Sequence, residues 1–399
     1  ACASAISFAL AATGRRPLWI TSAAMARLVA LLLVGSSVDL FALRHSRAGP
    51  EKTLIHHQWN SFSRVSVWGP FFSGSRWRIG EGAPVPVNPD GSQRPTHLAV
   101  VIDGGAQTPM PHFTGDMREV AYFGYDVTAL PYHIRPAGNA LIIGTGGGRD
   151  ILTARLLGVE KIRAVEINPL IVDIARNRYS EFSGDPYGLP GVEVSIRDGR
   201  SYAAESREQF DVVQLAAVDT FAASGAGAMA LVEHSLYTVE AFQDYFDRLS
   251  DDGVLAVTHL WGMPAPERAL RTADLVRRAW GSRGIDDPSR HVVIIGRQPA
   301  WGTLLASRRP FTDDELDRLR QLTGQLGFGL LYAPGAPDAH PAATRLLGPE
   351  GDEFLREYPL NVSATTDDRP FFFFFDRPVD FLRAGLSGVT SLPERRGFI

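Results

Sequence analysis

The sequence contains the run Leu141-Ile142-Ile143-Gly144-Thr145-Gly146-Gly147-Gly148-Arg149-Asp150, in which a short apolar segment leads directly into closely spaced glycines. Glycine allows a tight turn and lets backbone N–H groups approach a ligand closely, because it has no Cβ atom. The helix that we expect after this turn would point its positive dipole end at the same ligand. The run therefore predicts a turn that binds a nucleotide or nucleoside.

Strand-like and helix-like segments alternate on the carboxyl side of this run. We expect strands at residues 140–143, 163–167, 192–197, 211–215 and 253–260, and helices at residues 151–157, 169–179, 200–207, 239–249 and 266–280. This alternation indicates a parallel sheet with helices on both faces. Residues 291–297 and 301–308 lie too close for a crossover helix, so they should form an antiparallel hairpin. The predicted fold class is α/β, a Rossmann-like and mostly parallel sheet with a terminal antiparallel hairpin, as in class I S-adenosylmethionine-dependent methyltransferases.

Two acidic residues stand at the ends of the second and third expected strands. Glu166 is placed to accept hydrogen bonds from both ribose hydroxyls of a nucleoside. A dinucleotide-binding loop has a third glycine where Arg149 stands, and this bulky side chain would obstruct close helix–strand packing. The loop therefore favours a nucleoside without a pyrophosphate. Asp198, next to Gly199, is expected either to hold the adenine amino group or to cap the following helix.

Asp219 is the first candidate for a catalytic residue. It follows the fourth expected strand, and ligands of open α/β sheets bind beyond the carboxyl ends of the strands. An enzyme that transfers a group to an amine needs a carboxylate that binds or deprotonates the amine. The alternative for Asp219 is a helix cap.

Composition narrows the class of protein. The hydrophobic fraction of 45% is normal for a folded chain, and 40 basic against 44 acidic residues give a net charge of −4. This balance does not support nucleic-acid binding, which usually requires a basic stripe. Cys2 is the single cysteine, which excludes a disulfide framework and a cysteine-rich metal site, so we expect no metal and a cytoplasmic location.

The first 45 residues are more apolar than the rest of the chain. Residues 18–43 are long enough to span a bilayer, but Arg27 and Asp39 would be costly there. The alternatives are an amphipathic or buried helix and, slightly favoured, the end of a membrane region. Because Ala1 opens the chain inside an apolar run, we expect a fragment or a processed product. We predict four segments: 1–45 membrane-proximal, 46–135 an N-terminal β region with a linking helix, 136–310 the nucleoside-binding α/β domain, and 311–399 a helical and aromatic tail.

From about residue 59 to residue 375, the chain resembles the spermidine synthase-like proteins, specifically the bacterial branch with a membrane region before the synthase-like domain. The residues that carry the resemblance are Trp59-Asn60-Ser61-Phe62-Ser63-Arg64, Ile102-Asp103-Gly104, the glycine run 144–150, Val165-Glu166-Ile167-Asn168, Asp198-Gly199, the segment 214–220, Tyr237-Thr238 and Thr366-Asp367-Asp368-Arg369-Pro370. The resemblance implies an N-terminal β region over the mouth of a class I methyltransferase-like sheet. It places the synthase-like domain in the cytoplasm, associated with a membrane through residues 18–43; the alternative is a soluble cytoplasmic protein.

The resemblance also implies a transferase. Its substrate would be S-adenosylmethionine or decarboxylated S-adenosylmethionine, and an aminopropyl or methyl group would pass to a small acceptor such as a polyamine. The nucleoside-binding residues would be Gly144, Gly146, Gly147, Gly148, Glu166, Asn168, Asp198 and Gly199. Asp219 would face the acceptor, and the resemblance is compatible with a homodimer.

Three departures from the family concern chemistry. Ala216 stands where the synthases have the aspartate that acts as base, and Gly147 stands where their loop has an acidic residue. The Tyr-Gln pair that helps hold the diamine has no clear counterpart near residues 122–125. Losing a general base costs about 10²–10⁴-fold in rate. The alternative function is therefore a catalytically degenerate, membrane-linked sensor or scaffold that binds a nucleoside. Nicotinamide-dependent oxidoreduction comes third, disfavoured by Arg149 and the terminal hairpin.

Overall fold

The computed structural model describes residues 53–72, 78–84, 86–87, 92, 94–218, 233–260, 266–297, 301–337 and 339–377, with a few isolated positions before residue 51. The chain forms two compact units, Ala1–Lys52 and Thr53–Ile399. In the first unit, strands β1 (His45–Ser46) and β2 (Gly49–Pro50) pair antiparallel. Most of the predicted membrane segment 18–43 lies outside the described residues. Among the residues that are described, no helix combines the length and the apolar character needed to cross a bilayer.

The second unit begins with an antiparallel sheet of four strands in the order β3-β4-β5-β6. The strands are β3 (Leu54–Trp59), β4 (Arg64–Phe71), β5 (His97–Ile102) and β6 (Ala106–Pro111). One face carries the apolar side chains of alternate residues, including Val65, Val67 and Val100, and packs against the main sheet. This separate sheet confirms the predicted N-terminal β region.

The main sheet has the strand order β14-β12-β13-β11-β10-β7-β8-β9. Its strands are β7 (Asn139–Ile143), β8 (Lys161–Glu166), β9 (Val192–Ile196), β10 (Phe210–Ala216), β11 (Leu249–Leu260), β12 (Val292–Arg297), β13 (Trp301–Ser307) and β14 (Gly329–Tyr332). Strands β9, β8, β7, β10 and β11 are parallel, whereas β13, β12 and β14 pair antiparallel. This topology confirms the class I methyltransferase-like fold with its terminal hairpin. The edge strand β14 was not predicted.

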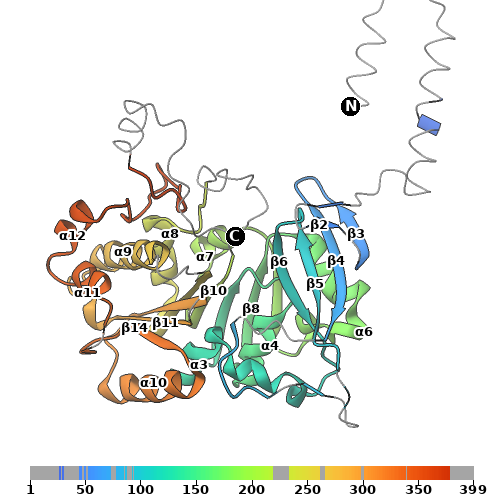
Figure 1. Ribbon diagram of the computed structural model, residues 1–399, viewed down its shortest axis with the longest axis horizontal. Helices are drawn as coiled ribbons and strands as arrows, with labels where there is room; N and C mark the ends of the chain where they lie inside the picture. Colours follow the sequence, from blue (N-terminus) through green and yellow to red (C-terminus); the bar gives the residue numbers. More distant parts are fainter. Residues whose placement is uncertain are drawn as a thin grey trace, which may run out of the picture. The chain divides into compact units, whose positions relative to one another are not determined.

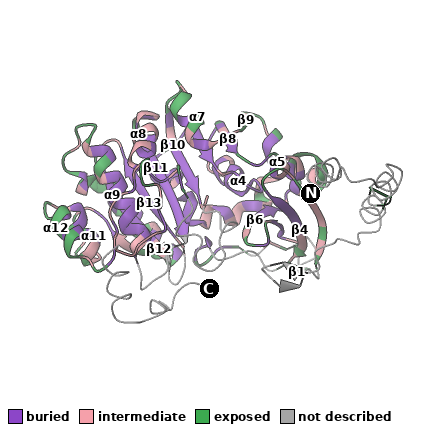
Figure 2. Ribbon diagram, turned by 90° about the horizontal axis from the view of Figure 1, so that it is seen from above, coloured by how far each residue is buried: buried purple, intermediate pink, exposed green. Residues whose placement is uncertain are grey.

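Helices cover both faces of the main sheet (Figure 1). They include α4 (Arg149–Leu156), α5 (Pro169–Asp173), α7 (Gly199–Glu205), α8 (Val239–Asp247), α9 (Glu267–Gly281), α10 (Asp313–Leu326), α11 (Pro341–Leu347) and α12 (Gly351–Glu357). In β7 and β10, odd-numbered residues such as Leu141 and Leu215 belong to the cluster with α8 and α9, while Ile142 and Val212 belong to the cluster with the N-terminal sheet. The central strands of the main sheet, such as β7 and β10, are consequently buried on both sides (Figure 2).

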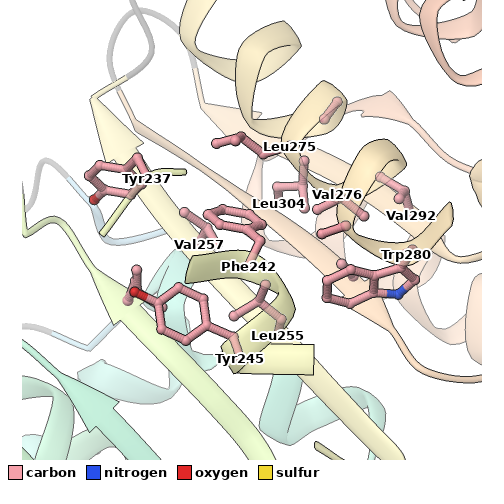
Figure 3. Packing of buried hydrophobic residues seen from close by; sticks show 14 of the residues in the cluster. Tyr237, Phe242, Tyr245, Leu255, Val257, Leu275, Val276, Trp280, Val292 and Leu304 are labelled. Atoms are coloured by element: carbon pink, nitrogen blue, oxygen red, sulfur yellow. The ribbon is translucent and has the colours of Figure 1, made fainter. Parts of the chain in front are cut away.

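The largest core cluster lies between β10, β11 and helices α8 and α9. Trp280, Tyr245 and Phe242 are fully buried in it and lie against the sheet (Figure 3). The phenylalanine run at 371–375 forms no strand, and two of its members, Phe372 and Phe373, enter the same core. The segment that follows the terminal hairpin therefore contributes an edge strand, helices and aromatic packing. The four-segment division predicted from the sequence stays a prediction.

Candidate functional site

The glycine turn joins β7 to α4 at the carboxyl edge of the sheet. Gly144, Gly146 and Gly148 have φ angles of 77°, 54° and 89°, a region that favours glycine. Gly147 is required for a different reason, because a Cβ atom there would overlap the carbonyl group of Pro109 in β6. The N-terminal sheet therefore lies directly against the turn.

Hydrogen bonds hold the turn from two sides. The N–H of Gly147 donates to Thr108 Oγ1 of β6 at 3.1 Å. Opposite, the hydroxyl of Tyr187 donates to the carbonyl of Gly146 and lies 3.0 Å from Thr145 Oγ1. Thr108 and Tyr187 were not predicted from the sequence, because both contacts join residues about 40 positions apart.

Glu166 is the last residue of β8, the strand next to β7. Its Oε2 accepts the N–H of Gly146 at 2.9 Å, and its Oε1 accepts the N–H of Asn168 at 2.9 Å. Burial raises the pKa of this carboxyl group, and the backbone N–H groups partly offset that effect. A carboxylate offers about four acceptor positions. The two backbone bonds leave room for ribose hydroxyls, so the residues present fit a nucleoside at this place.

Asn168 joins the site to the N-terminal sheet. Its Oδ1 caps α5 by accepting the N–H of Leu170 at 3.1 Å, and it also accepts Asn60 Nδ2 at 2.9 Å. Its Nδ2 donates to Ser63 Oγ at 3.0 Å, and the residue is 2% exposed. Asn168 therefore fastens the β3–β4 hairpin beside Glu166. Its predicted contact with a ligand stays a prediction.

Asp198 and Gly199 stand at the end of β9, where α7 begins. Asp198 Oδ1 accepts the N–H and the hydroxyl of Ser201 at 2.8 and 2.9 Å, which confirms the helix-cap alternative. Gly199 is buried against Ile143, and a Cβ atom at position 199 would overlap that side chain. The adenine-binding role of Asp198 is compatible with the cap and stays a prediction.

Two large apolar side chains are exposed near these acidic residues. Ile167 directly follows Glu166 and is 58% exposed, while Ile196, the strand partner of Glu166, is 52% exposed. An aromatic base would find an apolar surface at this edge of the sheet.

The predicted acceptor side of the site lies at the end of β10. Ala216 is 6% exposed, and Ala217 takes a positive φ of 54° while its N–H donates to the carbonyl of Thr258 in β11. Asp219 lies outside the described residues, so its predicted catalytic role stays a prediction.

Arg149 does not obstruct the packing of α4 on the sheet, so this prediction from the sequence is wrong. The side chain is 3% exposed, pairs with Asp126 at 2.5 Å, and places its guanidinium 5.2 Å from the ring centre of Phe123. It therefore packs toward the linking segment between the two sheets.

Residues 125–261 match the spermine/spermidine synthase domain family. The chain is 29% identical over 131 residues to the polyamine aminopropyltransferase of Thermoplasma volcanium, a match that covers 32% of this chain and 44% of that protein. It is 30% identical over 131 residues to the polyamine aminopropyltransferase of Thermotoga maritima, covering 32% of this chain and 40% of that protein. The chain thus spans less than half the length of these curated relatives.

Two solved structures are similar over a longer part of the chain. The spermidine synthase of Thermotoga maritima has 18% identity and a TM-score of 0.44, over 76% of this chain and 92% of that chain. A probable spermidine synthase of Corynebacterium glutamicum has 14% identity and a TM-score of 0.45, over 78% of this chain and 96% of that chain.

Proposed function

We propose that the chain is a spermidine synthase-like transferase that binds decarboxylated S-adenosylmethionine and transfers its aminopropyl group to a small polyamine-type amine. The observation that carries this proposal is the buried carboxylate of Glu166, which is joined to the glycine turn by the N–H of Gly146. The match of residues 125–261 to the spermine/spermidine synthase domain supports it.

The nucleoside would lie across the ends of β7, β8 and β9. Gly144, Gly146, Gly147 and Gly148 would face it with the backbone of the turn, and Glu166 would accept the ribose hydroxyls. Asp198 would hold the adenine amino group beside the buried Gly199, with Ile167 and Ile196 as apolar cover. Asn168 would keep this edge closed through its bonds to the β3–β4 hairpin.

The proposed reaction is a displacement at carbon. The acceptor nitrogen attacks the carbon next to the sulfonium, the carbon–sulfur bond breaks, and its electron pair stays on sulfur to give neutral methylthioadenosine. The charged leaving group needs little acid assistance, so positioning supplies most of the acceleration. The amine must lose one proton, and Asp219 is the proposed acceptor of that proton.

Ala216 favours a second candidate function. A buried methyl group stands where the resembling synthases carry their base, so a nucleoside-binding sensor or scaffold without turnover is the alternative. Both candidates require the nucleoside site, and they differ only in turnover.

The decisive experiment is a ligand titration followed by product analysis. Thermal stability of the full chain should rise with decarboxylated S-adenosylmethionine, S-adenosylmethionine and methylthioadenosine, and should not change with NAD. Incubation with putrescine or spermidine should then yield methylthioadenosine and an aminopropylated amine, detected by mass spectrometry. If the product is a methylated amine, the reaction is methyl transfer and not aminopropyl transfer. Binding without any product would favour the nucleoside-binding sensor. No stabilisation by any adenosyl compound would refute the proposal.

The variant Asp219→Asn tests the proposed base. We expect transfer to fall by about 10²–10⁴-fold while nucleoside affinity is kept. Unchanged turnover would remove Asp219 from the reaction.

Membrane association through residues 18–43 and a homodimer are further proposals. Flotation of the full chain with lipid vesicles tests the first, and light scattering after gel filtration tests the second. A deletion of residues 18–43 that still floats would refute the assignment to this segment.

A further inference from the structure

Four buried charged side chains meet behind the glycine turn, beside the first residues of α4. Arg78, Asp126, Arg149 and Asp150 are exposed by 4%, 0%, 3% and 5%. Their formal charges cancel, as two arginines face two aspartates. Buried charges are costly unless they are paired, so each member of the cluster depends on the others.

Asp126 is the centre of this cluster. Its Oδ2 lies 2.5 Å from Arg149 Nη2 and 3.2 Å from Arg78 Nη2, while its Oδ1 accepts the N–H of Thr128 at 3.0 Å. The same carboxylate therefore contacts three places: Arg149, the first residue of α4; Arg78, in the segment between β4 and β5; and Thr128, in the linking segment.

Asp150 forms the second link. Its Oδ1 accepts Arg78 Nη2 at 3.0 Å, Thr128 Oγ1 at 2.9 Å and Gln214 Nε2 at 3.3 Å. Gln214 lies in β10, the strand that ends at Ala216. The cluster consequently connects the start of α4 to the strand that leads to the acceptor side.

The electrostatics show how tightly Arg149 is enclosed. Burial lowers the pKa of Arg149, and Asp126 opposes that effect. His97 in β5 has its pKa lowered to about 4, first by burial and then by the charge of Arg149. Arg149 also lies over the ring of Phe123, which belongs to the 3₁₀ helix η2 (Met117–Tyr125). Its side chain therefore acts on both the N-terminal sheet, through His97, and η2.

We infer that Arg149 and Asp126 are positioning residues that fix the glycine turn for the adenosyl ligand. Arg149 directly follows Gly148, so a shift of its side chain moves the backbone whose N–H groups reach Glu166 and Thr108. The inference rests on the proposed function, since it assigns the ion pair to the nucleoside site named there.

Three variants of the full chain test this role. Arg149→Ala removes the ion pair, Arg149→Lys keeps the charge, and Glu315→Gln is the matched control. Glu315 pairs with Arg135 at 2.7 Å, and both side chains are buried, with Arg135 8% and Glu315 10% exposed. This control pair joins α10 to the chain before β7, so it involves neither the turn nor Glu166.

The readouts are the dissociation constant of methylthioadenosine by calorimetry and the melting temperature. We expect about 10–100-fold weaker binding for Arg149→Ala and an intermediate loss for Arg149→Lys. Glu315→Gln should lower the melting temperature with binding within about twofold of the wild type. If Arg149→Ala does not fold, Arg149→Lys against the control decides the question.

Two results would overturn the inference while leaving the proposed function standing. One is wild-type affinity in the folded Arg149 variants, and the other is an equal loss of affinity in the control. If the wild type itself binds no adenosyl compound, the proposed function fails and the inference fails with it.

Discussion

The two halves of the sheet's carboxyl edge differ in the side chains that the described residues place there. At the ends of β7 and β8, Glu166 bonds the glycine turn, and Asn168 fastens the hairpin above it. At the end of β10, the described chain offers the methyl group of Ala216 and then passes to Asp219 outside the described residues. The proposed function therefore assigns nucleoside binding and group transfer to different parts of the molecule, and variants can separate them.

The largest expected effect is on the nucleoside half. Glu166→Ala removes the proposed acceptor of two ribose hydroxyls, and hydrogen bonds to a charged group are each worth about 1.5–3 kcal/mol. We expect the dissociation constant of methylthioadenosine, measured by calorimetry, to rise by about 10²–10⁴-fold. Glu193→Ala on the neighbouring strand β9 is the control, because that side chain is exposed and bonds Arg163. Equal affinity in the two variants would contradict the assignment of Glu166.

The next effect concerns the acceptor half. Ala216→Asp introduces the carboxylate that the resemblance implies at this position, and we expect the proposed aminopropyl transfer to rise by about 10²-fold. Nucleoside affinity should stay within about twofold, since β7 and β8 are untouched. Ala216→Asn is the matched control, as it has the same shape without the charge. If both variants transfer at the same rate in a coupled product assay, the missing carboxylate does not limit turnover.

The features that the sequence could predict are those that depend on neighbouring residues in the chain. The parallel strands, the hairpin and the glycine turn follow from local periodicity and local glycine spacing, so their positions were predictable. Strand β14 was missed because no strand–helix alternation surrounds it, and it lies at the edge of the sheet, where it pairs with β12.

Long-range contacts account for the remaining errors. The hydrogen bond from Asn60 to Asn168 joins residues 108 positions apart, so no local sequence pattern predicts it. The sequence marked Arg149 as an unusual residue, but it could not show that Asp126 would receive the side chain. Residues whose partners lie on other elements are therefore the least predictable part of the site.

The ion pair of Glu315 should make the stability of the fold depend on pH at a place outside both halves. Burial tends to raise the pKa of Glu315, but hydrogen bonds from Arg135 and Arg309 lower it to about 2. Because the folded pKa lies below the ordinary value of 4.5, this stabilisation is fully present above about pH 4.5 and is lost as the pH falls toward 2. Arg309 is partly exposed, so we expect about 1–3 kcal/mol rather than the full shift.

Urea unfolding measures this difference. Glu315→Gln should have a lower free energy of unfolding than the wild type at pH 7, and the difference should shrink to about half by pH 3, because the folded pKa of Glu315 is about 2. Nucleoside affinity of the folded protein at pH 7 should be unchanged. A difference that persists undiminished at pH 3 would show that the charge of Glu315 is not the cause.

The smallest expected effect tests whether the β3–β4 hairpin serves the nucleoside half. Asn60→Ala removes the bond to Asn168 Oδ1 and the acceptor for the N–H of Ser63, at 2.9 and 2.8 Å. Since the N–H of Asn168 bonds Glu166, we expect methylthioadenosine to bind about 3–10-fold more weakly, within the range for losing one hydrogen bond. Thr312→Ala is the control because it removes the capping box of α10, far from the turn in the chain, at a similar cost of about 1 kcal/mol. If Asn60→Ala lowers stability as the control does but keeps full affinity, the hairpin is fastened to the sheet without ordering Glu166, and the nucleoside half is complete without it.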